Sequence, residues 1–261
     1  MEFKIETMTD YAARGEKPEV LFWVGCAGSF DERAQKITRA VAKILHHSGV
    51  RFAVLGTEES CTGDPAKRAG NEFLFQMQAM TNIQILNGYE ITRIVTACPH
   101  CFNTLKNEYP ELGGNYQVFH HSELLQSLIN DGRLQVKGGS FEGKKITFHD
   151  PCYLGRGNSV YEAPREVIEK LDSALAEMKR SRAKGFCCGA GGAQMFKEPE
   201  QGSKDVNIER TEEALALKPD VIAVGCPFCM TMMTDGVKHF NKEEEVKVMD
   251  IAELIASAND L

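Results

Sequence analysis

The sequence predicts an α/β fold of two pseudo-symmetric modules, each a small parallel sheet flanked by helices, with cysteine sites at the carboxyl ends of the strands. Short apolar segments alternate with segments of helical periodicity, which is typical of parallel βαβ units. The cysteine spacing also repeats, because 35 residues separate Cys26 from Cys61 and also Cys152 from Cys187. A Cys-Pro-x-Cys pair follows in each half, at 98–101 and 226–229.

The elements of the first half follow from its apolar pattern. Apolar residues at helical spacing predict an amphipathic helix over 31–47, which Gly49 ends. A run of β-branched residues before Cys98 predicts a buried strand. In order, the expected elements are a strand at 20–24, a helix at 31–47, a strand at 51–55, a helix at 66–87, a strand at 91–97, a short helix at 101–107, a strand at 116–119 and a helix at 122–130.

The second half repeats this order. Its expected elements are a strand at 145–149, a helix at 164–171, a strand at 174–178, a helix at 206–217, a strand at 221–224, a strand at 246–249 and a helix at 251–256. A stretch rich in glycine and polar residues, 132–144, is expected to link the halves. We therefore expect a first cysteine-rich module at 1–131 and a second at 145–261.

Composition bounds the class of protein. A hydrophobic content of 43% and a charged content of 26% are those of a soluble globular chain, which can bury a core without disulfides. The net charge of −7, with dispersed Lys and Arg, argues against nucleic-acid binding. Residues 1–18 have no apolar signal-peptide core, and the apolar run 20–24 is too short to span a bilayer. A cytoplasmic location is expected, at most peripheral on the inner membrane face through partners.

Reduced thiols in such a compartment are typical of metal-binding or catalytic sites. Four cysteines directly follow predicted strands, so cysteines distant in sequence are expected to gather at one sheet edge. The candidate metal ligands are Cys26, Cys61, Cys98 and Cys101 in the first module and Cys152, Cys187, Cys188, Cys226 and Cys229 in the second.

Thiolates suit zinc or iron–sulfur clusters. A zinc ribbon needs two close CxxC pairs, whereas these lie 128 residues apart, although the first four cysteines could still form a Cys₄ zinc site. Compact ferredoxin runs are absent from the sequence, so an iron–sulfur site with dispersed ligands is favoured. Two alternatives remain: a thiol–disulfide enzyme using Cys98 and Cys101, and buried cysteines acting as core residues.

The chain resembles the cysteine-rich CCG-domain family, which includes the B subunit of heterodisulfide reductase and iron–sulfur subunits of glycolate, lactate and glycerol-3-phosphate dehydrogenases. The stretches that carry the resemblance are His149-Asp150-Pro151-Cys152 and Cys187-Cys188-Gly189. It implies a non-cubane [4Fe–4S] cluster on the five cysteines of the second module. In the first module Thr62 replaces the second cysteine of the motif. Four thiolates suit a cubane [4Fe–4S] cluster, so two different clusters are expected.

Four further residues are predicted to surround the second cluster. Gly189, Gly191 and Gly192 would let backbone N–H groups approach the sulfur atoms, and His149 is a candidate hydrogen-bond donor to sulfur. The pair at 120–121, two histidines before a predicted helix, is interpreted as packing, with a proton relay as the alternative.

The expected function is electron transfer by one subunit of a multi-subunit oxidoreductase. The sequence carries no flavin-binding or ferredoxin motif. The expected partners are therefore a flavoprotein dehydrogenase subunit and a ferredoxin-like or membrane iron–sulfur subunit. The resemblance implies quinone as the acceptor. The alternative is a heterodisulfide reductase-like subunit that cleaves a disulfide at a non-cubane cluster, which Thr62 disfavours. A structural zinc protein is the third hypothesis.

Overall fold

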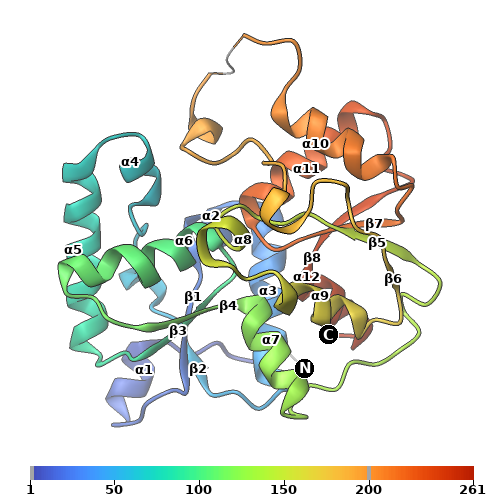
Figure 1. Cartoon of the computed structure of the whole chain (residues 1–261). Coiled ribbons are helices and arrows are strands. Elements are labelled where there is room, and N and C mark those ends of the chain that lie inside the picture. Colours follow the sequence, from blue (N-terminus) through green and yellow to red (C-terminus); the bar gives the residue numbers. More distant parts are fainter. Residues whose placement is uncertain (1–2, 199–200) are drawn as a thin grey trace.

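Two four-stranded parallel sheets form the framework of the computed structural model, which describes residues 3–198 and 201–261 (Figure 1). Their strand orders are β2-β1-β3-β4 and β6-β5-β7-β8, so both sheets have the same topology. The strands are β1 (Val20–Trp23), β2 (Phe52–Ala53), β3 (Arg93–Thr96), β4 (Gln117–His120), β5 (Lys145–Phe148), β6 (Ala174–Leu175), β7 (Val221–Val224) and β8 (Lys247–Asp250). The predicted α/β class with two parallel sheets is confirmed.

Helices flank both sheets. Those of the first half are α1 (Met8–Ala13), α2 (Gly25–Phe30), α3 (Glu32–His47), α4 (Asp64–Arg68), α5 (Glu72–Gly88), α6 (Pro99–Asn103) and α7 (His121–Asn130). Those of the second half are α8 (Gly155–Asn158), α9 (Glu162–Glu169), α10 (Val206–Leu215), α11 (Pro227–His239) and α12 (Ile251–Ala258). Because each helix returns the chain to the start of the next strand, the carboxyl ends of the strands in each sheet lie at one edge.

The central strands β1 and β7 are apolar along their whole length. All four residues of β1 and all four of β7 are buried, as expected where helices cover both faces of a parallel sheet. The register pairs Leu21 with Ile94 in the first sheet and Ile146 with Val221 in the second. This pairing brings the ends of β1 and β3, and likewise of β5 and β7, side by side.

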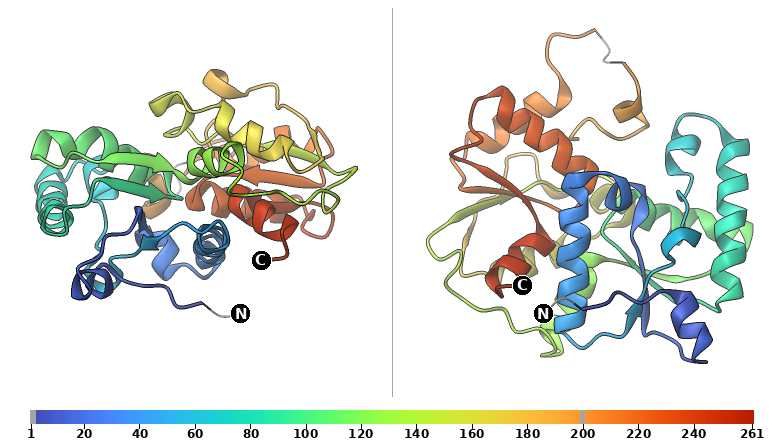
Figure 2. Two further views of the ribbon diagram at one scale, coloured as in Figure 1. Left: turned by 90° about the horizontal axis from the view of Figure 1, so that it is seen from below. Right: turned by 180° about the vertical axis from the view of Figure 1, so that it is seen from behind.

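The two halves share one hydrophobic core. Helix α3 packs against α12 of the second half, between the two sheets (Figure 2). Residues of both halves, including Leu45 and Ile255, belong to one buried cluster. Arg33 adds a polar tie, because its guanidinium donates two hydrogen bonds of 2.7 Å to the carboxylate of Glu253. The relative placement of the two sheets is therefore fixed by packing as well as by charge.

Some elements differ from the prediction. The expected continuous helix over 66–87 is wrong, because the chain breaks at Gly70, whose φ of +85° ends α4, and Asn71 caps α5 by accepting from Leu74 N. The expected strands at 51–55 and 174–178 shrink to two residues each. Sequence reasoning missed α1, α2, α8 and α11.

Residues 131–144, all of them described, contain neither helix nor strand, as expected of a connection. Leu134 and Phe141 are nevertheless buried in the shared core, which anchors the segment. The division into modules at 1–131 and 145–261 stays a prediction. Among the described residues, no helix combines the length and the apolar character needed to cross a bilayer.

Candidate metal centres

The strand order places the cysteines at the edge where parallel sheets bind ligands. In each parallel sheet the strand order reverses at the central pair of strands, β1 and β3 in the first sheet and β5 and β7 in the second. Ligands bind outside the carboxyl ends of the strands at such a point. Cys26 lies in the first turn of α2, directly after β1, and Cys98 caps α6 after β3. In the second sheet Cys152 follows β5, and Cys226 caps α11 after β7.

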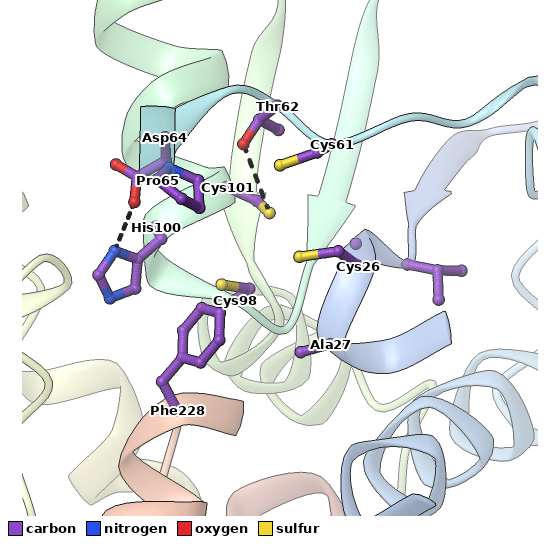
Figure 3. Close-up of a pocket in the computed structure, with 12 residues that line it drawn as sticks. Cys26, Ala27, Cys61, Thr62, Asp64, Pro65, Cys98, His100, Cys101 and Phe228 are labelled. Carbon is purple, nitrogen blue, oxygen red and sulfur yellow. Dashed lines mark hydrogen bonds and ion pairs between the residues drawn. The ribbon is translucent and has the colours of Figure 1, made fainter. Parts of the chain in front are cut away.

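The first centre is a pocket lined by Cys26, Cys61, Cys98 and Cys101 (Figure 3). The pocket also contains Thr62, whose side chain faces Cys101. Gly25 in its wall has a φ of +77°, and a Cβ there would lie 3.3 Å from the sulfur of Cys101. A side chain at this position would therefore intrude on the thiols.

Neighbouring thiols shift one another's ionisation in this pocket. The interaction of Cys26 with Cys61 raises the pKa of the Cys26 thiol and lowers the pKa of the Cys61 thiol to about 7. The interaction of Cys98 with Cys101 likewise holds the pKa of Cys98 well below its usual range, while the pKa of Cys101 rises. Each pair can thus lose one proton readily and the second only with a compensating cation. Such a donor set fits a metal ion or an iron–sulfur cluster.

Thr62 occupies the position that Cys188 has in the second centre. Its hydroxyl donates a hydrogen bond of 3.9 Å to the sulfur of Cys101, the second cysteine of the first Cys-Pro-x-Cys pair. In the second half, Cys229 donates to the sulfur of Cys188 at 3.3 Å. The same pair of positions is therefore in contact in both half-sites, with a hydroxyl in place of a thiol in the first.

The turns around these residues also match. Gly63 has a φ of +88° and donates its backbone N–H to the sulfur of Cys61 at 3.4 Å. Gly189 has a φ of +94° and donates its backbone N–H to the sulfur of Cys187 at 3.3 Å. Both turns need a residue that tolerates positive φ, which explains glycine in both motifs.

The second centre contains five thiols. Cys188, Cys226 and Cys229 are buried, whereas Cys152 and Cys187 are partly exposed. Cys187 accepts hydrogen bonds from Cys152 and Cys188, which lowers its pKa and raises theirs, in the case of Cys188 to about 12. This set of five thiols therefore also suits a metal, because the extra protons leave only when positive charge replaces them.

The predicted neighbours of the second centre have different roles. The ring of His149 lies beside it, since the ligand atoms of His149, Cys188 and Cys229 are all within 4.8 Å of one another. A Cβ on Gly191 would lie 4.0 Å from the sulfur of Cys152, in ordinary contact. A Cβ on Gly192 would meet nothing within 4 Å, so its φ of +65° explains this glycine better than close approach does.

The two centres adjoin. The pKa of Cys98 is lowered first by Cys101 and then by Cys226 of the other half, so these two thiols are neighbours. Phe228 of the second Cys-Pro-x-Cys pair lines the first pocket (Figure 3) and packs edge-on against the ring of His100, with ring centroids 5.3 Å apart. The cysteines of each half thus gather within that half, but the two groups share their walls.

Sequence reasoning missed a polar group on the wall of the first centre. Nδ1 of His100 lies 2.9 Å from a carboxylate oxygen of Asp64, whose other oxygen accepts from Arg68 at 3.0 Å (Figure 3). Burial opposes protonation of His100, but the Asp64 carboxylate outweighs it and raises its pKa. The signal was present in the sequence, because His100 stands inside the Cys-Pro-x-Cys pair and Asp64 directly follows the Cys61 motif.

Glu59 is a second residue that the sequence did not reveal. Its partly buried carboxylate accepts hydrogen bonds from the backbone N–H of Val24 at 3.0 Å and of Gly25 at 2.5 Å, where β1 leads to Cys26. Burial raises the pKa of Glu59 to about 7 despite these hydrogen bonds. The carboxylate thereby fixes the turn that presents the first cysteine.

The two histidines at 120–121 join the halves. His120 caps α7, and its Nε2 lies 3.0 Å from the carbonyl oxygen of Gly225. His121 lies 2.9 Å from the carboxylate of Asp250, which caps α12. Both rings are buried and engaged in contacts between the halves, which agrees with the packing interpretation.

Comparison with known proteins places these features in a family. The family model "CCG: Cysteine-rich domain" matches residues 20–106 and again residues 146–234. The chain therefore belongs to the CCG cysteine-rich family, with two copies of the domain.

The relatives are longer than this chain, and one of them is named as iron–sulfur-binding. The chain is 47% identical to the "Probable iron-sulfur-binding oxidoreductase FadF" of Bacillus subtilis, in an alignment that covers 98% of this chain and 36% of that protein. It is 43% identical to the "EtfAB:quinone oxidoreductase" of Syntrophomonas wolfei, in an alignment that covers 94% of this chain and 35% of that protein. It is 31% identical to one subunit of the dihydromethanophenazine:CoB--CoM heterodisulfide reductase of Methanosarcina barkeri, in an alignment that covers 93% of this chain and 59% of that protein. The chain thus spans a third to three fifths of these relatives. Iron–sulfur binding, without number or type of cluster, follows from the family and these names.

Proposed function

We propose that this chain is an iron–sulfur electron-transfer unit of a multi-subunit oxidoreductase. It would pass electrons between a flavoprotein or ferredoxin-like partner and an acceptor such as quinone. The observation that carries the proposal is that the nine cysteines gather into two adjoining sets, which meet where Cys98 contacts Cys226. Two adjoining sets suit a relay, in which one centre accepts electrons and the other delivers them.

The proposed ligands are the cysteines that line each centre. Cys26, Cys61, Cys98 and Cys101 would hold a cubane [4Fe–4S] cluster in the first centre. Cys152, Cys187, Cys188, Cys226 and Cys229 would hold a non-cubane [4Fe–4S] cluster in the second. When bound, such clusters supply one-electron carriers whose potentials depend on net charge and on hydrogen bonds to sulfur.

The chain's own residues would set those potentials. Gly63 and Gly189 direct backbone N–H groups at sulfur, and the hydroxyl of Thr62 donates to Cys101. Burial of Cys98 and Cys226 keeps water away from the contact between the centres. Donors to sulfur stabilise added negative charge, so each favours the reduced state of the centre that it touches.

Partners are proposed from the relatives and from the chain itself. The relative from Syntrophomonas wolfei is named for EtfAB and quinone, which supports a quinone acceptor here. The proposed electron donor is a flavoprotein dehydrogenase subunit. A ferredoxin-like or membrane iron–sulfur subunit would then connect the chain to the membrane, on whose inner face it would lie peripherally.

Metal and sulfide analysis of anaerobically purified protein tests the proposal, with EPR spectra of the wild type and of Cys188→Ala. About eight irons and eight sulfides per chain are expected for two such clusters. Two EPR signals are expected, of which one changes in the variant. Zinc without sulfide would overturn the proposal and leave the structural zinc hypothesis.

A second candidate function is reductive cleavage of a disulfide, as the name of the heterodisulfide reductase relative suggests. The observation in its favour is a small cavity beside both centres, lined by His100, Asp64, Phe228, Phe196 and Met195 among others. The cavity offers one polar pair on an apolar wall. Turnover of a thiol disulfide by the reduced protein, without any partner subunit, would favour this candidate over a relay.

A further inference from the structure

We infer that Arg210 fixes His149 in the tautomer with its proton on Nε2, so that His149 is a hydrogen-bond donor to the second centre and not a metal ligand. The inference rests on the proposed function, because the acceptor would be a sulfur atom of the cluster or of its thiolates. It assigns Arg210 a positioning role that no motif in the sequence indicates.

The environment of His149 is polar on one side and sulfur-rich on the other. The side chain is 1% exposed. Its Nδ1 accepts a hydrogen bond of 3.0 Å from Nε of Arg210. Its Nε2 has no hydrogen-bond partner among the residues that the structure describes, and the ring lies within 4.8 Å of the sulfurs of Cys188 and Cys229. A buried polar atom without a partner is costly, so the missing partner is expected at the centre itself.

The direction of the Arg210 hydrogen bond decides the tautomer. A guanidinium has only donors, so Nδ1 of His149 must be the acceptor and cannot carry a proton. A neutral imidazole holds one proton, which is therefore on Nε2.

This arrangement is the reverse of that around a ligating histidine. A histidine that binds a metal through one nitrogen donates its other N–H to a carboxylate or carbonyl group. Here the outer nitrogen accepts from a cation instead, and the inner nitrogen keeps its proton. Ligation is thereby left to the five cysteines, and His149 can donate to sulfur.

Arg210 is itself held in place. Its side chain is fully buried, and its NH1 group donates to the carbonyl oxygen of Arg180 and to Glu213, both at 2.8 Å. The carboxylate of Glu213 in turn accepts two hydrogen bonds from Arg180, one from Nε at 2.9 Å and one from the backbone N–H of Arg180 at 2.6 Å. The guanidinium therefore cannot rotate away from His149 without breaking several buried contacts.

The first repeat has a comparable donor. Trp23 precedes Cys26 by three residues, as His149 precedes Cys152. Its indole is fully buried in the hydrophobic cluster that contains Cys98 and Cys101, and its Nε1 has no partner among the described residues. Indole nitrogen is always a donor. Both repeats thus place a buried ring N–H at the same register position.

The tautomer is tested directly by ¹⁵N NMR of histidine-labelled full-length protein as purified, whatever its metal content. His149→Leu identifies the signals. We expect the ¹⁵N shift of a protonated Nε2 and an unprotonated Nδ1 for His149. The opposite pattern would overturn the inference, and it would do so even if the protein held no cluster.

The effect on the centre is tested by redox titration followed by EPR, with iron and sulfide measured in every sample. His149→Leu should lower the potential of the second centre and leave that of the first unchanged. His149→Gln, which keeps an N–H donor at similar reach, should restore most of the shift. Equal potentials in wild type and His149→Leu at full iron content would overturn the inference while leaving the proposed function intact.

Arg210 is tested by a double-mutant cycle on the same titration. Arg210→Leu should shift the second potential in the direction of His149→Leu, because the proton is then free to move to Nδ1. In the His149→Leu background, Arg210→Leu should cause a clearly smaller shift, because only the loss of its charge remains. Additive shifts would show that Arg210 acts by its charge alone, and would overturn the positioning role.

Discussion

Exchange of Thr62 and Cys188 between the repeats should exchange the character of the two centres. Thr62→Cys would bring a fifth thiol to within reach of Cys101, where the hydroxyl now lies 3.9 Å from that sulfur. Cys188→Thr would remove the thiol that lies 3.3 Å from Cys229. If this single position decides between four and five thiolates, each variant should give two clusters of one kind.

The structural cost of both substitutions is small. Thr62 is 2% exposed, and replacing it by cysteine removes one buried methyl group, worth about 0.8 kcal/mol, and one weak hydrogen bond, worth about 1 kcal/mol. Cys188 is 4% exposed, and threonine adds a methyl group there, at about 1–3 kcal/mol of overpacking. Both losses are well below the about 5–15 kcal/mol of a typical domain, so both variants should fold.

The assay is EPR of reduced and oxidised protein beside iron and sulfide content, with Thr62→Ser as the matched control. Serine loses the same methyl group but adds no thiol, so it should keep the wild-type spectra. In Thr62→Cys the signal of the first centre should take the form of the second, and in Cys188→Thr the reverse should occur. Unchanged signals in both variants, at full iron content, would refute the view that this position selects the cluster type.

Three further predictions follow from contacts around the centres. Gly63→Ala should lower the free energy of unfolding, measured in urea, by about 2–4 kcal/mol, because its Cβ would lie 2.8 Å from the Phe75 ring and its φ is positive. In the matched variant Gly189→Ala the Cβ would meet only side-chain atoms, at 3.2 Å or more, so the loss should be smaller. Arg165→Met should lower the free energy of unfolding by about 3–5 kcal/mol, because it leaves the buried carboxylate of Asp150 without its bidentate partner at 2.8 and 2.9 Å. A loss of stability below about 1 kcal/mol would contradict this. Burial opposes ionisation of Glu213, but hydrogen bonds and charges from two arginines outweigh it and lower its pKa. The stability that wild type gains over Glu213→Gln should therefore be fully present above about pH 4.5, the ordinary range of a glutamate, and should disappear as the pH falls through the lowered pKa; a difference that grows on acidification would contradict the sign.

The positions of the cysteines could be predicted because local patterns determine them. The apolar segments 20–24 and 221–224 read as buried strands, and β1 and β7 form there. Once parallel strands are assumed, Cys26 and Cys226 must lie at carboxyl ends, where the structure places them. The repeat in spacing then brings the other cysteines to the same edge.

Contacts between distant segments could not be predicted in this way. The hydrogen bond from Arg210 to His149 joins residues 61 positions apart, and neither residue's local sequence indicates the other. The contact of Cys98 with Cys226 depends on how the two sheets pack. The break between α4 and α5 was missed because Gly70 lies inside a segment that otherwise has helical character.

The two repeats differ at two positions beside the centres. Thr62 corresponds to Cys188 in register, and Trp23 corresponds to His149. A hydroxyl in place of a thiol removes one potential negative charge from the first centre, and an imidazole in place of an indole gives the second a donor whose tautomer depends on a neighbour. The sheets, the strand-end cysteines and the glycine turns are meanwhile the same in both halves. A shared framework with altered charge and hydrogen bonding at the sulfurs is what two centres of different potential require, because these two properties set the potential of an iron–sulfur cluster.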